Sequence, residues 1–88
     1  MNNTMKRREW TDELGMWEYK LTQITDTIDA SYFNNEHQDP EMFEEVGNRL
    51  EIMQYADGIM LADFSNVRDL EHAEQLVNQF VEKLNANE

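Results

Sequence analysis

Carboxylates are the most abundant side chains in this sequence that could take part in chemistry. Nineteen Asp and Glu residues stand against seven Lys and Arg residues, which gives a formal charge of −12. Three of the bases are adjacent, at Lys6, Arg7 and Arg8, so residues 9–88 contain four bases and nineteen acids and have a charge of −15. Carboxylates can transfer protons, coordinate metal ions or form ion pairs with a basic partner. The residues around the carboxylates indicate which of these three roles is expected.

The usual nucleophiles do not occur in a catalytic pattern. The sequence has no cysteine, and neither Ser31 nor Ser65 lies in a Gly-x-Ser-x-Gly turn. Gly15, Gly47 and Gly58 are isolated from one another, so no glycine-rich loop is present that could hold a phosphate group. Pairs of nearby carboxylates arise by chance among nineteen acids. We therefore expect no enzymatic activity, no catalytic residue and no cofactor.

One pair of residues matches part of a metal-binding pattern. Asp69 and His72 are three residues apart, like half of the Glu-x-x-His arrangement of di-iron helical bundles. Such a site needs a second pair and two further carboxylates, whereas the one other histidine, His37, lies beside Glu36 in an expected loop. We expect His72 to be a surface residue in a charged helical turn and predict no metal. A site at Asp69 and His72, completed in a dimer, is the third hypothesis for this chain.

Apolar residues recur at intervals of three and four along most of the chain, which is typical of amphipathic helices. Three such stripes occur: Trp10, Leu14, Trp17, Leu21, Ile24 and Ile28; Phe43, Val46, Leu50, Met53, Met60 and Phe64; and Leu70, Ala73, Val77, Phe80 and Leu84. Three amphipathic helices with short connections predict an all-α fold, a small antiparallel three-helix bundle. We expect a single acidic helical domain at residues 9–88, preceded by a flexible basic N-terminal arm at residues 1–8.

Short polar segments set the expected ends of the second helix. Asp39 and Pro40 have the residue types of a helix N-cap and a first helical position. Asp57-Gly58 is a strong signal for a β-hairpin, but the apolar residues on its two sides do not alternate cleanly with polar ones. We therefore predict a helix with a kink or break near Gly58 rather than a hairpin.

The size of the chain favours self-association. A domain of 88 residues buries only about 60% of its unfolded surface, and without cysteine it gains no stability from disulfides. We therefore expect a homodimer formed through an apolar seam. The absence of cysteine fits a reducing compartment, and the bases at residues 6–8 are followed by acids rather than by the apolar segment of a signal peptide. No apolar run is long enough to span a membrane, so a cytoplasmic protein without membrane contact is predicted.

The charge predicts the class of partner. A body with a charge of −15 repels nucleic acids and anionic membranes and attracts basic surfaces. We therefore predict an acidic protein-interaction module that occupies a basic surface of a partner and does not bind nucleic acid directly. One form of this function is a DNA mimic, whose carboxylates replace phosphates and inhibit a DNA-binding protein. In size and charge the chain is similar to small phage and plasmid proteins that disarm host DNA-binding proteins or nucleases, a similarity of composition that involves no motif.

The expected partner-binding residues are acids of the second and third predicted helices, with one tyrosine off the apolar stripe: Glu41, Glu44, Glu45, Glu51, Asp57, Asp63, Glu71, Glu74 and Tyr55. Glu41 and Glu45 are four residues apart, a spacing at which like charges destabilise an isolated helix. A basic partner would offset that cost. The alternative is a structural or assembly module that docks through an apolar seam, with residues such as Leu50 and Phe80, and is acidic only for solubility.

Overall fold

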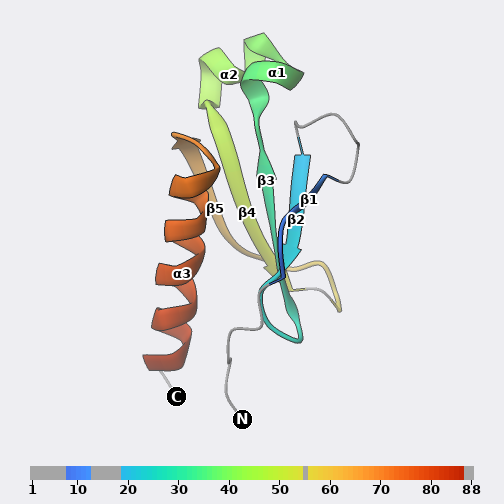
Figure 1. The fold of residues 1–88 in the computed structure, drawn as a ribbon, viewed down its shortest axis with the longest axis vertical. Coiled ribbons are helices and arrows are strands. Elements are labelled where there is room, and N and C mark those ends of the chain that lie inside the picture. Colours follow the sequence, from blue (N-terminus) through green and yellow to red (C-terminus); the bar gives the residue numbers. More distant parts are fainter. Residues whose placement is uncertain (1–7, 13–18, 55, 87–88) are drawn as a thin grey trace.

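The protein is an α+β fold in which a single antiparallel sheet has one long helix on one face (Figure 1). The computed structural model describes residues 8–12, 19–54 and 56–86. Its elements, in chain order, are β1 (Thr11–Asp12), β2 (Tyr19–Gln23), β3 (Ile28–Phe33), α1 (Asn35–Gln38), α2 (Pro40–Val46), β4 (Asn48–Gln54), β5 (Met60–Val67) and α3 (Leu70–Ala86). The strands lie in the order β1-β2-β3-β4-β5, and every neighbouring pair is antiparallel. The prediction of an all-α three-helix bundle is therefore wrong.

The first predicted helix is replaced by strands, apart from residues 13–18, which lie outside the described residues. Along β3 the apolar residues of the core occupy every second position, at Ile28, Ala30 and Tyr32. Positions four residues apart share a side in a strand as well as in a helix, so part of the apolar stripe fits either structure. Five of the seven residues at 22–28 are Thr or Ile, which favour strands. Local propensity therefore outweighed the apparent helical period.

Asp57 and Gly58 form the turn of a hairpin between β4 and β5. The Gln54 N–H donates a hydrogen bond to the Ile59 carbonyl and the Gly58 N–H donates one to the Gln54 carbonyl, each at 2.8 Å. Gly58 has a φ of 70°, which glycine adopts without a steric penalty. The predicted helix with a break near Gly58 is therefore wrong, and the alternative hairpin signal was correct. Clean alternation is missing from the sequence because the β4–β5 ladder contains two register irregularities.

Only the start of the second predicted helix is confirmed. Asp39 Oδ1 accepts hydrogen bonds from the N–H groups of Glu41, at 3.1 Å, and Met42, at 3.3 Å. Pro40 occupies the first turn, where its missing N–H is not needed. The helix, α2, ends after seven residues at Gly47, whose φ of 67° and ψ of −158° lie in a region that glycine alone enters readily. The chain then turns directly into β4.

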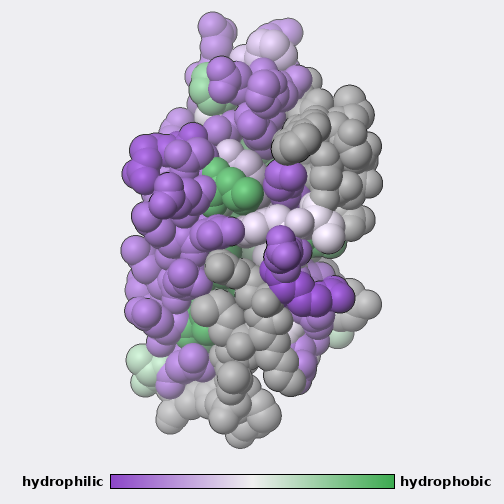
Figure 2. Space-filling view, viewed as in Figure 1, coloured by the Kyte–Doolittle hydropathy of each residue, from purple (hydrophilic) through white to green (hydrophobic). Residues whose placement is uncertain are grey.

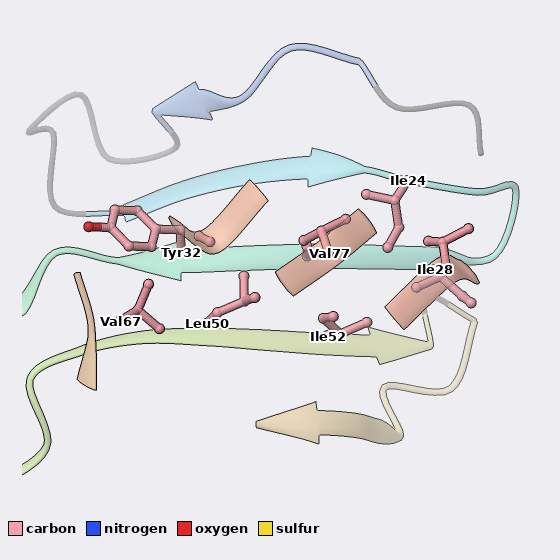
Figure 3. Packing of buried hydrophobic residues seen from close by; sticks show 10 residues of the cluster. Ile24, Ile28, Tyr32, Leu50, Ile52, Val67 and Val77 are labelled. Atoms are coloured by element: carbon pink, nitrogen blue, oxygen red, sulfur yellow. The ribbon is translucent and has the colours of Figure 1, made fainter. Parts of the chain in front are cut away.

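The third predicted helix is confirmed as α3, which covers one face of the sheet. Asp69, the residue before it, accepts a hydrogen bond from the His72 N–H at 2.9 Å and so stabilises the first turn. Val77 of α3 lies over the strands among the apolar residues labelled in Figure 3. Leu50 is completely buried and cannot contribute to the predicted docking seam. The buried apolar residues of the core are Ile24, Ile28, Ala30, Tyr32, Leu50, Ile52, Val67, Ala73, Val77 and Val81.

The last residue of the predicted basic arm is attached to the sheet. The Arg8 N–H donates a hydrogen bond to the Gln23 carbonyl at 3.2 Å, and the Arg8 carbonyl accepts one from the Thr22 hydroxyl. The rest of that arm, residues 1–7, lies outside the described residues. Arg8 therefore continues the edge of the sheet beside β2.

Replacing Gly47 by alanine will destabilise the protein more than the same change at Gly58. A β-carbon at Gly47 would lie 2.9 Å from the Asn66 Cα, whereas one at Gly58 would meet nothing within 4 Å. Because φ is positive at both sites, we expect Gly58→Ala to cost about 1 kcal/mol from the backbone conformation alone. Gly47→Ala should cost about 3 kcal/mol, since the clash is added. Urea denaturation followed by circular dichroism measures both, and equal losses would contradict the close packing of Gly47 against β5.

Candidate protein-interaction site

The helix α2 has no buried residue and lies at the end of the sheet where β3 ends and β4 begins (Figure 1). Glu41, Glu44 and Glu45 are exposed on it, and Met42 and Phe43 are 36% and 38% exposed. Carboxylates and apolar side chains are therefore exposed together on α2. An apolar centre with a polar rim is typical of protein interfaces.

A hollow of about 420 Å³ with acidic walls lies beside α2, and we call it the acidic hollow. Glu36 of α1 and the two α2 residues Phe43 and Glu44 form one side of it, and Arg68 lies on the other, between β5 and α3. The remaining walls are formed by Gly47, Asn48, Asn66 and Val67. The hollow therefore forms because the end of β5 lies beside the end of α2.

Asparagine side chains and backbone hold the parts of the acidic hollow together. The side chain of Asn35 is buried, and its Nδ2 donates a hydrogen bond to the Gly47 carbonyl at 2.7 Å, which joins the start of α1 to the end of α2. Asn48 Nδ2 donates to the Arg68 carbonyl at 3.5 Å. Asn66 has a φ of 58°, a conformation that asparagine tolerates better than most residues. These contacts fix the helical segment relative to the sheet.

Tyr32 is sensitive to the negative potential at this end of the molecule. Burial, and next the nearby carboxylates of Asp69 and Glu36, raise the pKa of Tyr32 to about 12. Glu36 belongs to α1 and Asp69 precedes α3, so acids from two separate parts of the chain act on one buried hydroxyl. Tyr32 remains neutral at physiological pH and does not add to the negative charge around it.

The acidic hollow and α2 together have the chemistry needed to hold a lysine or arginine side chain of another protein. Carboxylates such as those of Glu36 and Glu44 form charge-assisted hydrogen bonds with ammonium and guanidinium groups. The exposed ring of Phe43 can contact either the apolar stem or the cation of such a side chain. Arg68 is the one base among the described residues that line the hollow, and it opposes this binding.

A second hollow, of about 430 Å³, lies between the N-terminal segment and the start of α3. Arg8 and Lys20 line it together with Glu9 and Glu74. Trp10 lines it as well, and its Nε1 donates a hydrogen bond to Glu74 at 2.8 Å. Because acids and bases balance there, this hollow attracts a basic partner less than the acidic hollow does.

Some of the predicted partner-binding residues lie together. Glu41, Glu44 and Glu45 share α2, and Glu71 is exposed in the first turn of α3, near the end of the sheet that carries α2 (Figure 1). Asp57 lies at the opposite end of the sheet, in the turn between β4 and β5. The predicted residues therefore do not form one continuous surface.

Other predicted residues have different positions. Glu51 and Asp63 lie opposite each other on β4 and β5, and Arg49 forms an ion pair with Glu51 and lies 3.6 Å from the carboxylate of Asp63. Glu74 is partly buried and accepts the hydrogen bond from Trp10 described above. Tyr55 lies outside the described residues. Arg49 therefore neutralises part of the negative charge of Glu51 and Asp63.

Three residues discussed above, near the acidic hollow or Tyr32, were not among the predicted partner-binding residues: Glu36, Phe43 and Asp69. Glu36 precedes the Asp39-Pro40 helix start by three residues, and that signal could have placed it close to α2. Phe43 was assigned to an apolar stripe, although α2 is too short to bury it. The position of Asp69 depends on contacts between distant parts of the chain, for which the sequence has no local signal.

Asp69 and His72, the residues of the metal hypothesis, have structural partners at the start of α3. His72 Nδ1 accepts a hydrogen bond from the Arg68 N–H at 3.0 Å, and the His72 N–H donates to Asp69 Oδ1. Within the described ranges, no three or more His, Asp or Glu side chains are grouped so that they could hold a metal ion. The hydrogen bonds of helix capping account for this pair.

No protein-family model, curated protein or solved structure matches this chain. None of the helices in the described residues is both long and apolar enough to cross a membrane. The candidate site is therefore defined by the charge and shape of this molecule.

Tyr32 will make stability fall as the pH rises above the tyrosine pKa of the unfolded chain. That value is 10.0 and the folded value is about 12, so between them the folded state keeps a proton that the unfolded state has lost, and folding becomes less favourable. Tyr32→Phe removes this contribution. Urea denaturation at about pH 8 and about pH 11 should show a larger loss for the wild type than for Tyr32→Phe, and a smaller difference in a Glu36→Gln background. Equal losses in wild type and Tyr32→Phe would contradict the buried position of this hydroxyl near carboxylates.

Proposed function

We propose that this protein is a non-catalytic interaction module that binds a basic surface of another protein through its acidic end. The acidic end consists of six exposed acids: Glu36 and Glu44, which line the acidic hollow, Glu41 and Glu45 on the same helix as Glu44, and Asp69 and Glu71 at the start of α3. The observation that supports this most strongly is α2, a helix that buries none of its residues and exposes Met42 and Phe43 among carboxylates. Such a helix adds little to the core, and its side chains are available to a partner.

Charge and apolar area have different roles in this binding. An exposed ion pair contributes about 0–1 kcal/mol, so the carboxylates mainly accelerate and orient the encounter. Burial of Met42 and Phe43 supplies affinity at about 25 cal/mol for each Å² of apolar surface removed from water. Hydrophilic residues make up most of the coloured surface in Figure 2, and apolar residues form only small patches on it. Met42 and Phe43 are therefore exposed apolar side chains that lie close to carboxylates on the same helix.

The partner surface that we propose is one that binds DNA. Such surfaces have rows of lysine and arginine that contact phosphates, and the acidic end presents carboxylates from α1, α2 and the start of α3 in their place. The strongly negative net charge of −12 supports this choice, because it repels nucleic acid and attracts the basic surfaces that bind nucleic acid. Binding of this kind weakens as salt is added and is displaced by duplex DNA.

Affinity capture with charge-matched variants tests the acidic end. Immobilised wild-type protein should retain a basic protein from nuclease-treated lysate, and both salt and duplex DNA should release it. Glu36→Gln combined with Glu44→Gln should weaken binding of that protein about tenfold, at about 0.7 kcal/mol for each lost ion pair. The control, Asp57→Asn combined with Glu82→Gln, has the same net charge, but its changes lie in the hairpin turn and late in α3. It should bind like the wild type.

Arg68→Gln provides the reciprocal variant. It removes the base that lines the acidic hollow, and it should strengthen binding of the captured protein about threefold. Equal weakening by the acidic-end pair and the control pair would show that only net charge matters. A captured protein that stays bound at high salt, or that DNA does not displace, would contradict the proposed mode of binding.

A further inference from the structure

We propose that two copies of this chain associate through β5, whose outer edges pair antiparallel about Leu61 and join the two sheets into one. In the described part of the chain, β5 is the last strand of the sheet and pairs with β4 alone. An edge strand presents N–H and C=O groups with which another strand can pair. β5 has eight residues, whereas β1 at the other edge has two. A pair centred on Leu61 uses the first part of the longer edge, where residues 59–63 of the two copies lie opposite each other.

The first part of this edge exposes large apolar side chains. Ile59, Met60 and Leu61 are 53%, 46% and 38% exposed. Consecutive residues of a strand point to opposite faces of the sheet, so packing of one face cannot cover all three of them. Natural edge strands are usually protected by lysine, proline or inward charges. β5 contains neither lysine nor proline, and its one charge is Asp63.

The charge of this edge favours a second copy over a basic partner. In a chain with a net charge of −12, residues 58–62 have no charge at all, and Asp63 is the only charge between Gly58 and Val67. A basic partner would find few ion pairs there, whereas an apolar and nearly neutral edge is complementary to itself. An interface in which the same patch serves both subunits is the usual form of a twofold dimer.

The geometry of the pairing also keeps the acidic ends apart. An antiparallel pair centred on Leu61 places the later part of β5, up to Val67, in opposite directions in the two copies. At about 3.3 Å per residue, the two ends of β5 that lead to the acidic hollow then lie about 40 Å apart. That separation is several times the screening length of charges at physiological salt. The pairing therefore leaves the proposed partner-binding site of each copy free.

The effect of salt distinguishes this association from binding at the acidic end. The two copies repel each other through their net charge, so added salt should strengthen the dimer. Binding of a basic partner should weaken under the same change. Failure of one proposal therefore leaves the other unaffected.

Analytical ultracentrifugation of matched lysine variants tests the interface. The wild type should form a dimer over the micromolar range, and Met60→Lys should raise its dissociation constant by about tenfold or more, because like charges meet at the paired edges. Met42→Lys is the control, since it makes the same substitution at another exposed methionine, on α2. It should leave the dimer unchanged. A wild type that remains monomeric, or a control that dissociates as readily as Met60→Lys, would overturn the proposal.

Disulfide trapping tests the register without disturbing the fold. The chain has no cysteine, so Leu61→Cys introduces a single thiol that lies opposite its counterpart in a pair centred on Leu61. Directly opposed residues of antiparallel strands have Cα atoms about 4.5–5.5 Å apart, within the range that a disulfide bridges. Leu61→Cys should therefore form a covalent dimer on mild oxidation much faster than Met42→Cys. Equal rates for the two variants would contradict pairing through β5.

Discussion

The close approach of Gly47 to Asn66 is the constraint on which the acidic end depends. At this point α2 ends, β4 begins and β5 passes on its way to α3. Gly47 has backbone angles that suit glycine alone, its carbonyl accepts the hydrogen bond from Asn35, and a β-carbon on it would clash with the backbone of β5. Since Glu36 and Glu44 lie on the segment held by these contacts, the shape of the acidic hollow follows from one residue that has no side chain.

The sequence predicted the helices better than the sheet. The capping residues Asp39 and Pro40 and the regular apolar stripe of α3 are local signals, and both were read correctly. The sheet was missed because residues four apart share a side in either structure, so Ile24 and Ile28 fitted a helix as well as they fit the core below α3. Strand pairing is a long-range property, and the irregular β4–β5 ladder, with apolar residues exposed at its start, hid the alternation that would have revealed it.

The charge of the candidate site could be predicted, but its composition could not. Glu41, Glu44 and Glu45 are neighbours in sequence and remain neighbours on α2. Asp57, in contrast, is placed at the far end of the sheet by the hairpin that the sequence reading rejected. The contribution of Asp69 requires β5 to return beside α2, and no pattern within the sequence specifies that contact. Composition therefore predicts a kind of partner, whereas the fold determines which acids lie together.

The central claim is that basic groups bind at the acidic end rather than over the whole negative surface. An NMR titration of isotope-labelled protein with a peptide rich in lysine and arginine measures this directly, residue by residue. Amide shifts should be concentrated at residues 36–45 and 66–71, should saturate, and should disappear as salt is added. Shifts of similar size at remote exposed acids such as Asp57 and Glu82 would contradict the claim, because they would show that the acidity attracts cations without forming a site.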